Sequence, residues 1–184
     1  MTCSTQCAVG SPVGLGILRF ILGGCTGMSL DNDTKGPAVK FPPPLVFLSF
    51  ILLASLLQKL LPWTLPDSGV LNVLGALMVI ASLVAIFMVK RSFDKVDTEI
   101  EPWKPTSAIV STGLFAYSRN PIYLGFAVIT VGVGLYVGSL WIVLSALPAA
   151  LAVYRIAIKN EERYLEQKFG AEYLDYKAKV RRWI

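Results

Sequence analysis

Two polar segments of this chain carry side chains that could bind and position a small polar molecule. The first runs from Ser118 to Gly125 and sets a guanidinium, an amide and a phenol where a polar loop enters an apolar segment. The second runs from Glu161 to Tyr176 and contains two adjacent carboxylates and further tyrosines. Because an apolar hairpin joins the two segments, we expect them to form the two halves of one site at a membrane surface.

The chain contains no histidine among its 184 residues. This excludes a histidine general base, histidine-ligated metals and histidine-centred nucleophilic triads, and no metal site is expected. The sequence also lacks a glycine-rich phosphate-binding loop and a GxSxG nucleophile motif. Catalysis would have to use Arg, Glu, Tyr, Asn and backbone groups. Group transfer from an already activated donor suits these limits, because positioning then does most of the work.

The composition is that of a membrane protein, with 54% apolar residues and a mean hydropathy of +0.61. Four apolar runs of about 16 to 20 residues each approach the length that a helix needs to cross the hydrocarbon core. These runs cover about residues 44–61, 70–89, 122–138 and 140–158. The sequence therefore predicts an all-α integral membrane protein with about four transmembrane helices.

The distribution of basic residues predicts the orientation of these helices. Lys and Arg are concentrated in the loop between the second and third runs and in the C-terminal tail, whereas the connection 62–69 carries only Asp67. By the positive-inside rule, both termini and the long loop are expected in the cytoplasm, with the protein in a bacterial inner membrane. The net charge of +5 indicates attraction to anionic membrane lipids rather than to nucleic acid.

The remaining segments predict a poorly ordered arm and a cytoplasmic region. Residues 1–43 are rich in Gly, Ser and Pro, and we expect the membrane domain to cover 44–184, with its cofactor region at 90–121 and 159–184. After the two carboxylates, apolar and aromatic residues recur at spacings of three and four, which predicts a cytoplasmic amphipathic helix interrupted at Gly170. This stripe consists of Leu165, Phe169, Tyr173, Tyr176 and Val180.

Two local patterns predict backbone features. Pro121 suits the first turn of a helix, so Arg119 and Asn120 are expected at a helix N-terminus, which favours anionic groups. The pair Gly134 and Gly138, separated by three residues, predicts close packing of the third apolar helix against a neighbour.

The motifs in these two segments resemble those of the isoprenylcysteine carboxyl methyltransferase family and its bacterial relatives. GLFAYSRNPIYLG, an apolar hairpin and EERYLEQKFGAEYLDYKAKV follow in the order of that family's pattern, approximately RHPxYxG and then EExxLxxxFGxxYxxYxxxV. The resemblance covers the half of the chain from residue 90 onward. Asn120 departs from the histidine of the better-known members, and the Asn-Pro pair between their motifs is absent. The matching residues are Arg119, Pro121, Tyr123, Gly125, Glu161, Glu162, Leu165, Phe169, Gly170, Tyr173, Tyr176 and Val180.

The resemblance implies a helical-bundle methyltransferase that uses S-adenosyl-L-methionine and methylates a lipophilic acceptor arriving from the bilayer at the cytoplasmic face. Arg119 would pair with the cofactor carboxylate, and Glu161 or Glu162 would accept hydrogen bonds from its ribose or amino group. Tyrosines would stack on adenine or bond to a hydroxyl. Arg119 and Glu162 are the predicted catalytic residues. The predicted cofactor-binding residues are Arg119, Asn120, Pro121, Tyr123, Gly125, Glu161, Glu162, Tyr173 and Tyr176.

Other readings of the same residues remain open at this point. The enzyme could instead methylate phospholipid amines, or the chain could be a non-catalytic small membrane protein or carrier. Arg119 alone could anchor to lipid phosphate, and the aromatic stripe could serve packing. The two glutamates could be solvated charges that pair with basic residues nearby on the helix, which are Lys159, Arg163 and Lys168. The sequence does not determine the methyl acceptor or the oligomeric state.

Overall fold

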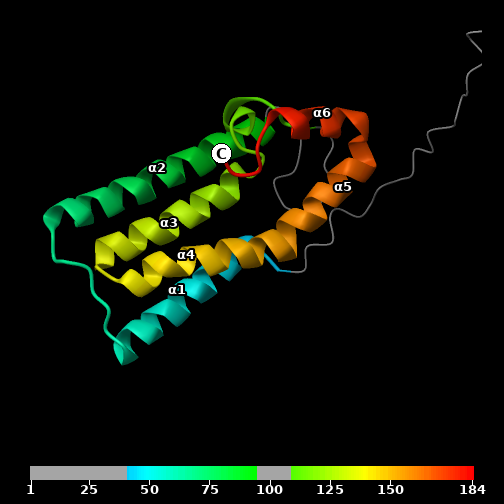
Figure 1. Cartoon of the computed structure of the whole chain (residues 1–184). Coiled ribbons are helices and arrows are strands. Elements are labelled where there is room, and N and C mark those ends of the chain that lie inside the picture. Colours follow the sequence, from blue (N-terminus) through cyan, green and yellow to red (C-terminus); the bar gives the residue numbers. More distant parts are fainter. Residues whose placement is uncertain (1–40, 95–108) are drawn as a thin grey trace, which may run out of the picture. The chain divides into compact units, whose positions relative to one another are not determined.

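The computed structural model describes residues 41–94 and 109–184 (Figure 1). Residues 1–40, which make up most of the predicted N-terminal arm, and residues 95–108 lie outside the described residues. Within the described ranges the regular structure is helical, apart from one isolated bridge between Thr64 and Ser139. The predicted all-α fold is confirmed.

Four apolar helices run alternately up and down, and their order in the chain decides which of them touch. Helix α2 packs against α3, α3 against α4, and α4 against α1 (Figure 1). The pairs α1–α2 and α3–α4 are joined by short turns, whereas the long loop connects α2 to α3. The helices are α1 (Pro43–Leu60), α2 (Gly69–Asp94), α3 (Pro121–Val137) and α4 (Leu140–Val153).

The fourth apolar helix does not end with the apolar sequence. It continues from α4 through a π-helical turn, η2 (Tyr154–Ile158), into α5 (Lys159–Phe169). Gly170 then adopts a positive φ of 53°, which a glycine tolerates without strain, and the chain turns into α6 (Ala171–Lys179). The structure therefore confirms the predicted helix after the two glutamates and its predicted interruption at Gly170.

Three of the described helices are long and apolar enough to cross a membrane, namely α1, α2 and the continuous helix Leu140–Phe169. The third predicted span, α3, is a shorter apolar helix of 17 residues. At 1.5 Å per residue it is about 25 Å long, near the lower limit for crossing a hydrocarbon core of about 30 Å. Most large apolar side chains of α1 and α2 are exposed rather than buried, as lipid-facing side chains are.

The two helical hairpins are tied together at one end of the bundle. The backbone N–H of Leu65 donates to the carbonyl of Gly138 at 2.8 Å, and the N–H of Leu140 donates to the carbonyl of Trp63 at 3.1 Å. The rings of Trp63 and Trp141 meet edge to face, with their centroids 5.3 Å apart. These bonds satisfy turn backbone groups that would otherwise be exposed to the interface.

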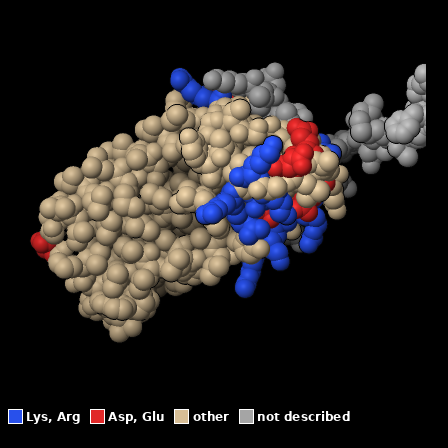
Figure 2. Space-filling model, turned by 45° about the horizontal axis from the view of Figure 1, so that its top comes forward, with Lys and Arg blue, Asp and Glu red and all other residues tan. Residues whose placement is uncertain are grey.

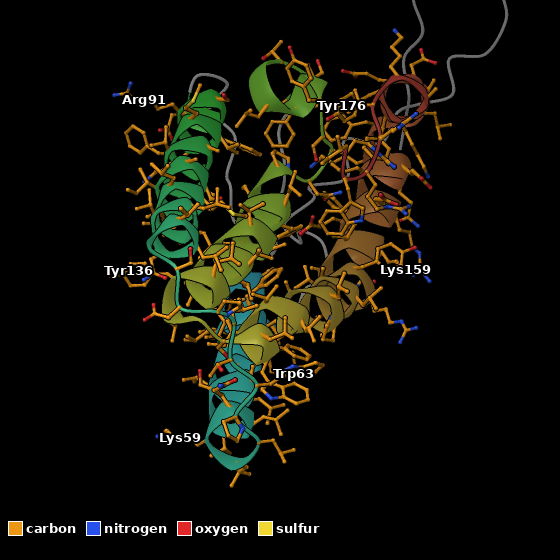
Figure 3. The ribbon with its side chains drawn as sticks, turned by 60° about the vertical axis from the view of Figure 1, so that its left-hand side comes forward. Lys59, Trp63, Arg91, Tyr136, Lys159 and Tyr176 are labelled. Carbon is orange, nitrogen blue, oxygen red and sulfur yellow. The ribbon has the colours of Figure 1, made fainter. Side chains whose placement is uncertain are left out.

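Charged residues lie mainly at the opposite end. In Figure 3, Lys59 lies near the connection between α1 and α2, whereas Arg91 and Tyr176 lie at the other end of the helices. Figure 2 shows Lys, Arg, Asp and Glu gathered mainly over one part of the molecular face, with uncharged residues over most of the rest. The described charged residues, which the sequence places mainly in the long loop and the C-terminal tail, thus lie mainly at one end of the helices.

Close helix packing involves one glycine of the predicted pair and two glycines outside it. A Cβ added to Gly75 in α2 would lie 2.5 Å from the carbonyl oxygen of Gly132 in α3, so these two backbones touch. Gly134 does pack closely, with an added Cβ only 2.6 Å from the backbone nitrogen of Val143 in α4. Gly138, however, ends α3 in a left-handed conformation with open space around it. The prediction of packing through Gly138 was wrong, because the turn needs that glycine for its backbone angle.

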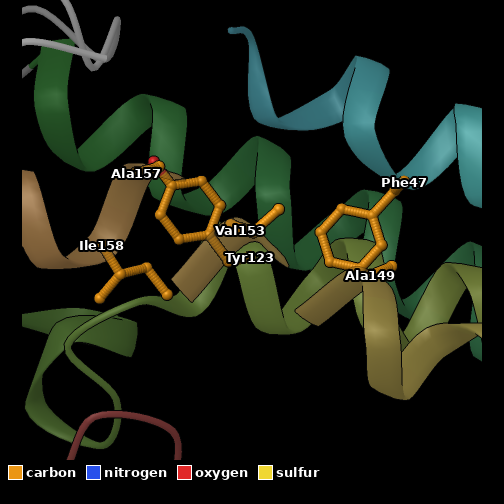
Figure 4. Packing of buried hydrophobic residues seen from close by; sticks show 6 residues of the cluster. All are labelled: Phe47, Tyr123, Ala149, Val153, Ala157 and Ile158. Carbon is orange, nitrogen blue, oxygen red and sulfur yellow. The ribbon is translucent and has the colours of Figure 1, made fainter. Parts of the chain in front are cut away.

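A buried apolar cluster lies beneath the charged end and joins α1, α3, α4 and η2 (Figure 4). Tyr123, in the first turn of α3, contributes its ring to this cluster. The site described below therefore rests on a packed floor. The cluster consists of Phe47, Tyr123, Ala149, Val153, Ala157 and Ile158.

We expect Gly75→Ala to destabilise the protein, because the new methyl group would meet backbone atoms of α3 that cannot move aside. Overpacking of this kind costs about 1–3 kcal/mol. Thermal unfolding of the detergent-solubilised protein, followed by circular dichroism, measures the change. Gly69→Ala is the matched control, since nothing lies within 4 Å of its added Cβ. Equal melting temperatures for the two variants would contradict the assigned helix contact.

Candidate functional site

The loop that leads into α3 is held in place by three aromatic residues. The 3₁₀ turn η1 (Gly113–Ala116) buries Phe115 against Val89, and the rings of Phe115 and Phe93 stack edge to face at 5.4 Å. From the other side, the hydroxyl of Tyr176 in α6 donates to the carbonyl of Phe115 at 2.8 Å. The loop is therefore fixed between the end of α2 and α6, and this fixes where the next residues point.

Arg119 is buried at this junction, with a side chain only 8% exposed. As predicted, Pro121 occupies the first turn of α3, with Asn120 as the N-cap and Arg119 directly before it. Its Nη1 lies 3.2 Å from Oε1 of Glu162 and 3.5 Å from the hydroxyl of Tyr173. The two motif halves, 43 positions apart in the sequence, thus meet through an ion pair.

Glu162 is held by a second guanidinium that the sequence analysis missed. Arg182 donates from Nε to Oε1 at 2.8 Å and from Nη2 to Oε2 at 3.0 Å, a two-point contact with both carboxylate oxygens. The same guanidinium lies over the ring of Tyr154 at 4.9 Å. The basic residues of the tail predict only the orientation of the membrane helices, and nothing in the sequence distinguishes Arg182 from the adjacent Arg181.

The tail that carries Arg182 is bound to the loop through backbone atoms. The N–H of Arg119 donates to the carbonyl of Arg181 at 3.0 Å. The Asn120 amide nitrogen and the Ser118 hydroxyl both donate to the carbonyl of Arg182, at 3.2 and 3.3 Å. The position where better-known relatives carry histidine is therefore used here to hold the C-terminal tail.

The electrostatics of this cluster leave an excess of positive charge. The hydrogen bond to Glu162 raises the pKa of Arg182, which stays protonated. Burial, together with the nearby Glu162 carboxylate, raises the pKa of Tyr173, so its phenol stays neutral. With Arg119 also charged, two guanidiniums surround one carboxylate.

One nitrogen of Arg119 lacks a hydrogen-bond partner. Among the described residues, its Nε is the buried side-chain nitrogen or oxygen atom for which the structure shows no acceptor. Leaving a buried donor without a partner costs about 1–3 kcal/mol, and more when the group is charged. A guanidinium with a free donor in positively charged surroundings suits an anionic ligand such as a carboxylate.

Glu161 points in another direction from Glu162 and has a different partner. Its carboxylate accepts a hydrogen bond from the hydroxyl of Tyr123, whose ring belongs to the buried cluster below. Adjacent residues on a helix lie about 100° apart, so one glutamate meets the apolar floor and the other meets the arginines. The alternative in which both glutamates are solvated and pair with neighbouring basic residues does not hold in the structure.

The other predicted site residues are divided between this cluster and its supports. Tyr173 and Tyr176 lie with ring centroids 6.2 Å apart, but the hydroxyl of Tyr176 is used to hold η1. Pro121 is buried at the start of α3. Gly125 lies outside the cluster, because an added Cβ there would meet the side chain of Ile86 in α2 at 3.0 Å.

We expect Arg182→Gln to lower the stability of the protein by roughly 1.5 kcal/mol, the low end for hydrogen bonds to a charged group, because Arg119 still neutralises Glu162. Arg181→Gln removes the same charge one residue earlier and keeps the backbone bond to Arg119, so it should be nearly neutral. Urea unfolding of the detergent-solubilised variants compares the two. Indistinguishable unfolding midpoints would show that the contact with Glu162 contributes nothing to stability.

Comparison with known proteins supports a common family for this chain. A family model of phospholipid methyltransferases matches residues 70–172, which include the whole first motif segment and the start of the second, with Glu161 and Glu162. The chain is 31% identical over 120 residues to the protein-S-isoprenylcysteine O-methyltransferase of Saccharomyces cerevisiae, covering 59% of this chain and 46% of that protein. It is 33% identical over 75 residues to the enzyme of the same name from Schizosaccharomyces pombe, covering 39% of this chain and 30% of the relative.

A shorter relative from Haemophilus influenzae, an uncharacterized protein, is 40% identical over 63 residues, which are 34% of this chain and all of the relative. The chain spans less than half the length of the two yeast relatives. Since the family model covers more than half of the chain and includes both Arg119 and Glu162, the chain belongs to the phospholipid methyltransferase family, as an integral membrane protein similar to the isoprenylcysteine carboxyl methyltransferases.

Proposed function

We propose that this protein is an S-adenosyl-L-methionine-dependent methyltransferase that methylates a lipophilic acceptor at the cytoplasmic face of a bacterial inner membrane. The observation that carries the proposal is the meeting of the two family motifs at one buried ion pair, Arg119 with Glu162. Family membership supports the reaction class. The concentration of basic residues at the site end supports the cytoplasmic orientation of both termini.

The residues present fit the proposed cofactor at its most polar end. The free Nε of Arg119 and the excess positive charge around it suit the carboxylate of an amino acid. The aromatic rings of Tyr173 and Tyr176 lie close by and suit a flat adenine ring. When bound, S-adenosyl-L-methionine supplies a methyl group on a positively charged sulfur, which a nucleophile can take without further activation of the donor.

The residues around this site divide into contact and positioning roles. Arg119 is the proposed anchor for the cofactor carboxylate. Both oxygens of Glu162 are held by guanidiniums, so its proposed role is to orient Arg119 and balance its charge. Asn120 and Pro121 fix the start of α3, and Gly125 allows α3 to approach α2.

Two acceptor classes remain distinct proposals. An isoprenylcysteine-like carboxylate arrives already ionised and needs no general base, which suits a chain without histidine. A phospholipid amine is the second candidate, favoured by the name of the matching family model. An amine must lose a proton before it attacks, and the bonded pair of Glu161 and Tyr123 beneath the arginines is the nearest group that could take it.

We expect the purified protein to bind S-adenosylhomocysteine with micromolar affinity, measured by calorimetric titration in detergent. Arg119→Gln should weaken binding at least tenfold, because it removes the charged donor. Glu162→Gln should also weaken it, because Arg119 loses its orienting partner. Lys179→Gln, an exposed charge change in the same region, should leave binding unchanged. If both site variants melt like the parent protein and bind with unchanged affinity, Arg119 and Glu162 do not take part in cofactor binding.

The pH dependence of methyl transfer should separate the two acceptors. A carboxylate with a pKa of about 3.5 is fully ionised above pH 6, so its methylation should change little between pH 6 and 8. An amine with a pKa of about 10 gains neutral form about tenfold per pH unit, so its rate should rise over the same range. Incorporation of labelled methyl groups into farnesylcysteine and phosphatidylethanolamine gives both profiles. Incorporation into neither, by protein that binds S-adenosylhomocysteine, would exclude both acceptors.

A further inference from the structure

The outward face of the last apolar helix changes from apolar to cationic along its length. Leu147 and Leu151 in α4 are 69% and 61% exposed. The next three positions at the same four-residue spacing are Arg155, Lys159 and Arg163, which are also exposed. Figure 3 shows Lys159 on the outer side of this helix. We call these three residues the cationic stripe.

The π-helical turn contributes to the alignment of the stripe with the leucines. In a uniform α-helix each step of four residues overshoots a full turn by about 40°, so the sixteen residues from 147 to 163 would drift by about 160°. Between Tyr154 and Lys159 the backbone bond spans five residues, which widens the turn and takes up part of this drift. Lipid-facing leucines and exposed cations therefore share one side of the helix.

The acidic residues of α5 are all engaged elsewhere. Glu161 bonds to Tyr123, Glu162 to the two arginines, and Glu166 to Lys177. In the parts of the chain that the structure describes, no carboxylate pairs with Arg155, Lys159 or Arg163. The acidic groups of helix α5 are thus bonded to internal partners, and its outer face carries Lys159 and Arg163.

We infer that the cationic stripe binds the phosphate groups of anionic phospholipids at the membrane surface. Its charge is complementary to anionic headgroups, and it continues directly from side chains that suit the lipid tails. The three cations span about 12 Å along the helix, enough to cross a headgroup layer of about 5–7 Å and extend just beyond it. Long Lys and Arg side chains reach such phosphates while their stems stay on the apolar surface.

This binding would fix the depth of the candidate site in the membrane. The stripe lies on the outer side of the same helix that carries Glu161 and Glu162 toward the interior. A lipid phosphate held by Arg163 would therefore set the height of the adjacent Glu162 relative to the bilayer. The inference concerns lipid binding alone and does not depend on methyl transfer.

Native mass spectrometry of the full-length protein in detergent, titrated with phosphatidylglycerol or phosphatidylcholine, tests the inference. We expect phosphatidylglycerol to bind at least tenfold more tightly than phosphatidylcholine. The triple change Arg155→Gln, Lys159→Gln and Arg163→Gln should remove this preference, since each charge near a lipid surface contributes about fivefold. The control removes three exposed charges elsewhere and should keep the preference: Lys59→Gln, Lys90→Gln and Lys179→Gln.

Several results would overturn the inference. An equal loss in the control would mean that net charge alone attracts the lipid, and no loss in the stripe variant would exclude the stripe. Displacement of the lipid by millimolar inorganic phosphate would identify a site for free phosphate instead. If the triple variant does not fold, the single changes serve, each with an expected loss of about fivefold. Binding of S-adenosylhomocysteine should be equal in all folded variants, which separates this test from that of the proposed methyltransferase.

Discussion

The arrangement of the charged end depends on one carboxylate held between two guanidiniums. Glu162 forms ion pairs with Arg119 in the loop before α3 and with Arg182 in the C-terminal tail. A single side chain thus connects α5, the loop and the tail. Backbone bonds from the loop to the tail complete the arrangement. Without the carboxylate, two like charges would face each other in a partly buried place, where Coulomb repulsion is weakly screened. Together with the aromatic contacts of Phe115, this interaction holds the loop and the start of α3 in place.

The same interaction explains why the site can favour an anion although it lies among carboxylates. Glu162 balances only one of its two cations, and Glu161 is turned away toward Tyr123. Of the two guanidiniums, that of Arg119 is the more buried, and its Nε has no hydrogen-bond acceptor. Burial strengthens such a charge because less water competes for it. A ligand carboxylate would supply the missing acceptor and the missing charge together.

Helix α5 separates the two kinds of charge by facing them in opposite directions. Glu162 points toward the arginines and Glu161 toward the apolar floor, while Lys159 and Arg163 lie on the exposed side of the helix, beyond the lipid-facing leucines of α4. This separation keeps Glu161 and Glu162 turned away from the exposed cations of the same helix. A lipophilic acceptor could then reach the site from the hydrocarbon side, and a polar donor from the water side, which is the geometry that the proposed reaction requires.

The sequence by itself determined the features that depend on local composition: the apolar helices, the proline at the start of α3, the break at Gly170 and the order of the family motifs. These follow because hydrophobic length and backbone preference act over a few neighbouring residues. Only the tertiary structure decided which side chains meet. In the structure Glu161 bonds to Tyr123, whereas Glu162 bonds to the arginines. Arg182 rather than Arg181 contacts Glu162 through its side chain. The expected close contact at Gly138 is absent, and Gly75 packs against Gly132. Neighbours of the same type are equivalent in a sequence. On α5 a rotation of about 100° per residue gives Glu161 and Glu162 different partners, whereas Arg181 and Arg182 lie beyond α6 and differ because only the Arg182 side chain reaches Glu162.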